Sequence, residues 1–150
     1  MAGGTGGHVY PALAVADYLR EQGIKIYWLG THAGLESRVV PEHGLPLLPV
    51  RVSGLRGKTL FRRIIAPLMI LVALMQSLLI MLKYKPAAVI GLGGFVSGPG
   101  GIAAWLLRKP LYIHEQNAIA GLTNRLLAPF AKAVMLGFPG ALHGGRVTIT

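Results

Sequence analysis

Short apolar runs alternate with longer amphipathic or apolar segments along most of the chain. The short runs predict strands at residues 24–29, 47–52, 88–92, 111–114, 133–136 and 146–150. The longer segments predict helices at 11–22, 35–42, 60–82, 102–107 and 119–131. Continuously apolar strands separated by helices are typical of a parallel sheet that is covered on both sides. We therefore predict an α/β fold, a Rossmann-like parallel sheet with helices on both faces.

The two ends of the chain interrupt this order. A Gly-rich loop of this kind should follow a strand, yet only Met1 and Ala2 precede the first one, and no helix follows the last predicted strand. We expect residues 1–150 to form one Rossmann-like domain that is incomplete at both ends, with its first strand mostly missing.

The predicted helix over 60–82 is unusually apolar. Between residues 64 and 82 only Gln76 and Ser77 are polar, and this stretch would be about 29 Å long, close to the thickness of a bilayer core. It could be a core helix, a helix on a membrane surface or a transmembrane span. A span would separate the two Gly-rich loops across the membrane, so surface contact is favoured. The residues expected to touch the membrane are Ile65, Leu68, Met69, Val72, Arg62 and Arg63.

Charge is scarce and one-sided. The 150 residues include 15 Lys and Arg but five Asp and Glu, a formal net charge of +10. Such a surface attracts an anionic partner, and net charge alone does not choose between phosphate groups, nucleic acid and an anionic membrane. Because aromatic residues make up only 7% and no recognition motif occurs, we expect no nucleic acid. With no cysteine and few carboxylates, neither a disulfide nor a metal site is expected.

Two Gly-rich loops precede predicted helices. The first reads GGTGGH over residues 3–8, and the second reads GLGGFVSGPGG over 91–101. Glycines let backbone N–H groups approach an anion, and a helix N-terminus adds a favourable dipole. Each loop could instead be a tight turn without a ligand, but two loops at the carboxyl ends of parallel strands favour one diphosphate site. The candidate binding residues in these loops are Thr5, Gly6, Gly7, Gly94, Ser97 and Gly98.

Polar residues that could transfer protons lie near the same edge of the predicted sheet. The run HEQN at 114–117 follows a strand, and its Glu115 is the only acid after Glu42. Glu115 could act in catalysis or simply cap a helix, and Asn117 could contact a ligand or form a turn. His8 lies beside the first loop and can titrate near neutrality, so it is a candidate general base. A histidine that is merely hydrogen-bonded at a helix start is the alternative.

Five motifs together carry a specific resemblance. They are GGTGGH at 3–8, SGLRGK at 53–58, GGFVSGPGG at 93–101, HEQNAIAGLTN at 114–124 and FPGA at 138–141. In this order and spacing they resemble glycosyltransferase family 28 over essentially the whole chain. The resemblance implies a GT-B architecture, in which two Rossmann-like domains face a cleft. This chain would be most of the N-terminal, acceptor-side half, without the C-terminal donor-binding domain.

The resemblance also implies a reaction. It is the inverting transfer of N-acetylglucosamine from UDP-N-acetylglucosamine to the C4 hydroxyl of lipid I, undecaprenyl-pyrophosphoryl-N-acetylmuramyl-pentapeptide, to give lipid II in peptidoglycan synthesis. The implied location is peripheral, on the cytoplasmic face of the bacterial plasma membrane. UDP-N-acetylglucosamine, lipid I and an anionic membrane surface are the implied partners, and no cofactor is expected. The chain alone should be inactive. A non-catalytic, membrane-associated module that binds a phosphosugar or nucleotide is the alternative.

Individual roles follow by position from the same resemblance. The positions that resemble donor contacts are Thr5, Gly6, Gly7 and Asn117. His8 and Glu115 align with polar residues important for activity, and His8 is the preferred base. The two Gly-rich loops resemble the proposed site for the acceptor diphosphate. Phe95 departs from the pattern, since many relatives have Tyr there, so this chain lacks that hydroxyl.

Overall fold

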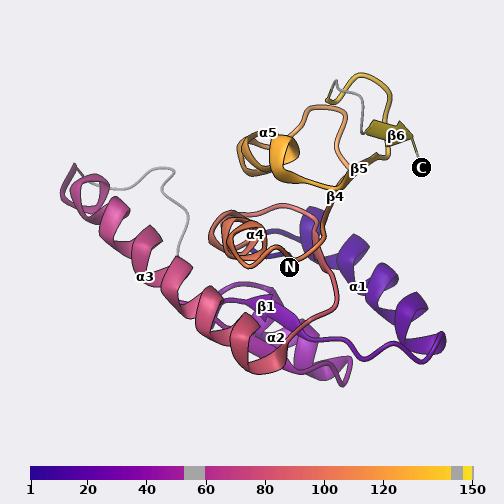
Figure 1. Ribbon diagram of the computed structural model, residues 1–150, viewed down its shortest axis with the longest axis horizontal. Coiled ribbons are helices and arrows are strands. Elements are labelled where there is room, and N and C mark those ends of the chain that lie inside the picture. The colour runs from indigo at the N-terminus through magenta and orange to yellow at the C-terminus, as the bar shows by residue number, and fades with distance from the viewer. Residues whose placement is uncertain (53–59, 143–146, 150) are drawn as a thin grey trace.

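Helices and strands alternate along the chain from α1 to α5 in the computed structural model (Figure 1). The structure describes residues 1–52, 60–142 and 147–149, and only the backbone of 60–65. The helices are α1 (Gly6–Glu21), α2 (Glu36–Glu42), α3 (Leu60–Tyr84), α4 (Ser97–Leu106), α5 (Leu122–Leu127) and the 3-10 helix η1 (Ala128–Phe130). The strands are β1 (Trp28–Gly30), β2 (Leu47–Pro49), β3 (Val89–Gly91), β4 (Leu111–Glu115), β5 (Ala133–Leu136) and β6 (Val147–Ile149).

All strand pairs are parallel, as predicted. β1 pairs with β2, and a four-stranded sheet has the order β3-β4-β5-β6. Met1 and Ala2 lie between the two groups of strands. The Met1 amino group donates to the Ile90 carbonyl (2.7 Å), the Leu92 amide donates to the Met1 carbonyl (3.0 Å), and the Trp28 indole N–H donates to the Ala2 carbonyl (3.0 Å).

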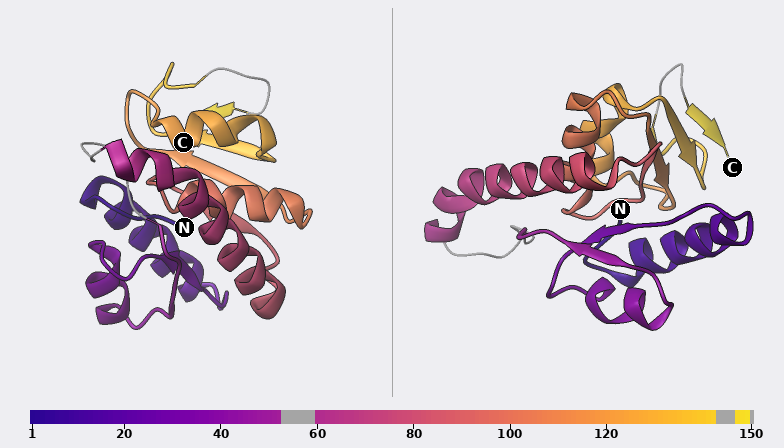
Figure 2. Two further views of the ribbon diagram at one scale, coloured as in Figure 1. Left: turned by 90° about the vertical axis from the view of Figure 1, so that its left-hand side faces the viewer. Right: turned by 60° about the horizontal axis from the view of Figure 1, so that its bottom comes forward.

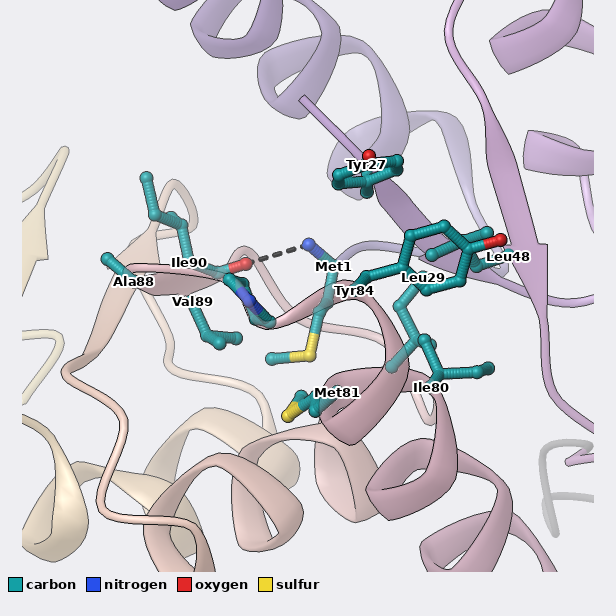
Figure 3. Close-up of a pocket in the computed structure, with 11 residues that line it drawn as sticks. Met1, Tyr27, Leu29, Leu48, Ile80, Met81, Tyr84, Ala88, Val89 and Ile90 are labelled. Atoms are coloured by element: carbon teal, nitrogen blue, oxygen red, sulfur yellow. Dashed lines mark hydrogen bonds between the residues drawn. The ribbon is translucent and has the colours of Figure 1, made fainter. Parts of the chain in front are cut away.

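A small apolar pocket surrounds Met1 (Figure 3). Its walls are side chains from β1, the end of α3 and β3, among them Leu29, Met81 and Val89. Burial lowers the pKa of the Met1 amino group to about 5. The group is therefore neutral at physiological pH, and its hydrogen bond to Ile90 is one between uncharged partners.

Helices cover both faces of the strands (Figure 2), which confirms the predicted fold class. Successive side chains of β1 point to opposite faces, as in any strand. Trp28 packs in a cluster with buried residues of α1 and α2, whereas Leu29 packs with Val96 and Ile80. The largest cluster joins α3, α4 and α5 to β3, β4 and β5.

Several element boundaries differ from the predicted ones. α1 begins at Gly6 rather than at residue 11, and α4 begins at Ser97 rather than at 102, so both helices start inside the Gly-rich loops. β1 begins at Trp28 rather than at 24. The predicted helix at 119–131 is the shorter α5 followed by η1, because Pro129 has no N–H to continue an α-helix. The predicted basic loop at 53–59 lies outside the described residues.

α3 is buried along one side and exposed along the other. Ala66, Ala73, Ser77 and Met81 face the domain, and the Gln76 side chain accepts a hydrogen bond from the Arg51 amide (2.7 Å). Within the described part of the chain, Ala66–Tyr84 is long and apolar enough to cross a membrane by length and composition, with a mean hydropathy of 2.0 and 22% of it buried. The helix packs along α4.

Candidate functional site

The first Gly-rich loop leads directly into α1 and leaves backbone amides uncovered. Thr5 is the N-cap residue in an extended conformation, and its hydroxyl bonds the His8 Nδ1 (2.9 Å) rather than an amide of the helix. In the described structure, no acceptor lies against the amides of Gly6 and Gly7. Uncovered N–H groups at the start of a 16-residue helix form an anion-binding arrangement.

The second Gly-rich loop touches the first one. A Cβ atom at residue 94 would overlap the Gly3 carbonyl oxygen, so the two backbones are in direct contact. A Cβ atom at residue 93 would overlap the His8 ring, and the Phe95 ring lies 3.1 Å from the Cβ position of Gly4. The structure thus brings together the two loops that the sequence analysis predicted to share one site.

Ser97 does not fit the ligand-binding role predicted for its hydroxyl. The side chain is completely buried, and its hydroxyl donates to the Gly93 carbonyl (2.8 Å) and faces the Met1 carbonyl (3.2 Å). A hydroxyl with these partners has no free face for a phosphate. Ser97 instead shapes the second loop, whereas Gly98 at the start of α4 is half-buried, with only Thr123 near its Cβ position (3.7 Å).

Glu115 ends β4 as a buried carboxylate with both oxygens occupied. Oε1 accepts from the Asn117 amide (3.0 Å) and side chain (2.8 Å), and Oε2 accepts from the Gly121 amide (3.0 Å) and the Asn124 side chain (2.9 Å). Burial by itself would raise the pKa of Glu115, but these four hydrogen bonds outweigh it and lower the pKa. A carboxylate so stabilised is a poor proton acceptor. The geometry favours a role in holding the exposed Asn117 and the loop that follows it.

His8 is half-buried next to both loops. Burial lowers its pKa, and the negative charge of Glu115 partly opposes that shift. The imidazole is therefore neutral at physiological pH. When Nδ1 carries the proton and donates it to the Thr5 hydroxyl, Nε2 keeps a free lone pair. His8 can then accept a proton from a substrate hydroxyl.

Comparison with known proteins identifies the family. Residues 1–136 match the Glycosyltransferase family 28 N-terminal domain. The chain belongs to glycosyltransferase family 28. This confirms the resemblance seen in the sequence motifs.

Two similar relatives of this family 28 chain carry the same name. It is 59% identical over 148 residues to the "UDP-N-acetylglucosamine--N-acetylmuramyl-(pentapeptide) pyrophosphoryl-undecaprenol N-acetylglucosamine transferase" of Alkalilimnicola ehrlichii, covering 97% of this chain and 42% of that protein. The protein of the same name from Nitrosococcus oceani is 57% identical over 146 residues, covering 97% and 41%. The chain thus spans about two fifths of the length of these curated relatives.

A solved structure agrees with the family assignment. The crystal structure of Acinetobacter baumannii MurG matches with a TM-score of 0.90 and 45% sequence identity, covering 100% of this chain and 44% of that chain. The Rossmann-like fold is therefore the one found in the N-terminal part of a family 28 transferase.

The family 28 chain also exposes a broad apolar surface on α3. Leu68 (61% exposed) and Val72 (39%) point outward, and Met69 is half-buried. The side chains of Arg62, Arg63 and Ile65 lie outside the described residues. A separate exposed aromatic pair lies on α4 and η1, where the Trp105 and Phe130 rings pack at a tilt (4.9 Å between ring centroids) beside a hollow lined by Arg108, Lys109 and Lys132. The sequence pattern did not predict this aromatic pair.

Two buried polar residues of the site escaped the sequence analysis. Glu36 is completely buried and Asn124 almost completely. Glu36 accepts a hydrogen bond from the distant Gly4 amide, and the Asn124 side chain donates to the Glu115 carboxylate. One signal for Glu36 was available, because this acid opens a short helix directly after a segment that contains Gly30 and Gly34. In the described structure, no three His, Asp or Glu side chains are grouped so that they could hold a metal ion.

Proposed function

We propose that this chain is the acceptor-side part of an enzyme that transfers N-acetylglucosamine from UDP-N-acetylglucosamine to lipid I, with lipid II as the product. The names of its relatives support the reaction. The observation that carries the proposal is the backbone contact between the two Gly-rich loops, where uncovered amides of α1 lie beside the neutral His8.

The proposed chemistry begins at His8. Its Nε2 removes the proton of the C4 hydroxyl of the acceptor sugar while that oxygen attacks the anomeric carbon of the donor. The bond from the anomeric carbon to the UDP oxygen breaks, the electron pair leaves with UDP, and the configuration inverts. The proton remains on His8 until solvent or product removes it.

The remaining predicted site residues bind and orient substrate in this proposal. Amides of Gly6 and Gly7, with those near Gly94 and Gly98, stabilise diphosphate charge through the positive ends of α1 and α4. Thr5 orients His8, and the exposed Asn117 is free to contact the donor. Glu115 holds Asn117 in place.

A chimera tests this function. Residues 1–150 replace the matching N-terminal part of A. baumannii MurG, which aligns with the whole chain. The chimera is expected to transfer radiolabelled N-acetylglucosamine from UDP-N-acetylglucosamine to a lipid I analogue, and to release UDP only when the acceptor is present. A folded chimera that binds the nucleotide sugar yet transfers nothing would contradict the proposal and favour a non-catalytic binding module.

We further propose that the exposed surface of α3 docks on the cytoplasmic face of the plasma membrane, peripherally. The free energy falls when exposed apolar side chains leave water for the lipid. The net charge of +10 adds attraction to anionic lipids. This placement would bring the site to a lipid-linked acceptor.

Polar substitutions on α3 should therefore weaken membrane binding. The double variant Leu68→Asn/Val72→Asn is expected to bind vesicles of phosphatidylethanolamine and phosphatidylglycerol about tenfold more weakly in a sedimentation assay, since two outward aliphatic side chains no longer enter the lipid. Tyr18→Asn on α1 is the matched control, because Tyr18 is also exposed (63%) but lies away from α3. Equal losses in both variants would count against docking through α3.

A further inference from the structure

A second buried carboxylate lies beneath the first Gly-rich loop. Glu36 is the first residue of α2, and its side chain is completely buried. Within the described residues the one ion pair joins Arg20 and Asp17, so Glu36 has no cation there. A buried charge is costly unless hydrogen bonds replace its water. The function of Glu36 must therefore be sought in the groups that donate to it.

Three donors converge on the Glu36 carboxylate from two separate segments. The Gly4 amide donates to Oε2 (3.0 Å), and the Thr31 amide (3.1 Å) and hydroxyl (2.7 Å) donate to Oε1. The Thr31 hydroxyl also accepts from the Gly34 amide (3.1 Å). Glu36 thus ties the first Gly-rich loop to the segment that follows β1.

Three glycines make room for this side chain. A Cβ atom at residue 3 would lie 2.7 Å from the Glu36 Oε1, one at residue 30 would lie 2.9 Å from the Glu36 Cγ, and one at residue 34 would overlap the carboxylate. The close fit leaves the carboxylate one position, in which one of its oxygens faces the loop.

The bond to Gly4 acts at the base of the anion site. Gly4 has a φ of +95°, and the next residue is Thr5, the N-cap of α1, whose hydroxyl bonds His8. We propose that Glu36 is a positioning residue, which fixes the Gly4 peptide so that the Gly6 and Gly7 amides and His8 face the ligand phosphate. This inference rests on the proposed function and deepens it.

Electrostatics and positioning predict opposite effects for removing the charge of Glu36. A negative charge near an anion site repels the anion, so neutralising it should tighten anion binding if charge alone mattered. A glutamine in the same place cannot serve all three donors, because its NH₂ group faces either the Gly4 amide or the Thr31 amide. The positioning role therefore predicts weaker binding.

The test is pyrophosphate binding to the full 150-residue chain, followed through backbone amide NMR signals. Glu36→Gln is expected to weaken pyrophosphate binding about tenfold, the size of one lost charge-assisted hydrogen bond, and to shift the Gly4 amide signal. Thr31→Val is the matched control, since it removes hydroxyl bonds to the same carboxylate but keeps the Gly4 bond. It should lower the melting temperature while leaving pyrophosphate affinity and the Gly4 signal unchanged.

Unchanged or tighter pyrophosphate binding in a folded Glu36→Gln variant would overturn the inference. Should that variant not fold, hydrogen exchange in the unaltered chain decides. The Gly4 amide should then exchange slowly while the Gly6 and Gly7 amides exchange fast, and equal rates at the three positions would overturn the positioning role. If the unaltered chain binds no pyrophosphate, the proposed anion site is wrong. The exchange rate of the Gly4 amide then still shows whether its hydrogen bond to Glu36 fixes the loop.

Discussion

Replacing His8 with alanine in the chimera should lower kcat by about 100-fold or more, with a much smaller change in the KM for UDP-N-acetylglucosamine. In the proposed mechanism the neutral imidazole beside the uncovered amides of α1 is the base, and general base catalysis contributes about 10² to 10⁴ in rate. Steady-state transfer to a lipid I analogue measures the effect. A His8→Ala chimera with undiminished turnover would show that another group takes the proton.

The pH dependence gives a second check on His8. Burial lowers its pKa, so the basic, neutral form persists to a lower pH than for an ordinary histidine, with a pKa of 6.5. The value of kcat/KM should therefore stay level as pH falls toward 6.5 and decline only below it, where His8 gains its proton. This acid limb should disappear from whatever residual activity His8→Ala retains. Asp17→Asn, an exposed acid on α1, is the control that should keep it.

A methyl group at residue 94 should destabilise the domain strongly. Gly94→Ala is expected to lower the free energy of unfolding by about 3 kcal/mol, for two reasons. The new Cβ would overlap the Gly3 carbonyl, and alanine would have to adopt the left-handed φ of +80°. Urea unfolding of the full chain, followed by circular dichroism, measures this. Pyrophosphate binding should fall as well, since the two loops would be forced apart.

Gly140→Ala isolates the contribution of the loop contact. Gly140 has nearly the same φ, +81°, but nothing lies within 4 Å of its Cβ position. Its substitution should cost about 1 kcal/mol, from the left-handed conformation alone. Equal losses of stability in the two variants would mean that the loops can separate without cost. The backbone contact between the loops would then not be needed to hold the site together.

The alternation of strands and helices was predictable because it follows from local apolar patterns. The strand at Ala133–Leu136 has the predicted bounds. β1 starts late for a local reason that the pattern does not reveal. The Ile24 amide donates to the Leu19 carbonyl in the helix cap, so this residue cannot yet enter a strand.

Helix starts and buried polar groups were harder to predict, because they depend on contacts between distant segments. Glycine has a low helix propensity, so α1 and α4 were expected to begin after their loops, yet packing between the loops lets them begin inside. The sequence predicts a ligand-binding hydroxyl at Ser97, but in the fold this hydroxyl donates to the Gly93 carbonyl. Glu36 was missed because its partner Gly4 is 32 residues away.

The backbone contact between Gly3 and Gly94 limits how such a site can diversify. Backbone amides and carbonyls are the same for every amino acid except proline, so point mutations offer few ways to alter this contact without breaking it. New substrate preferences would have to arise at the edge of the site, at positions such as Asn117 and Phe95. Side chains can vary there while the backbone of the two Gly-rich loops stays the same.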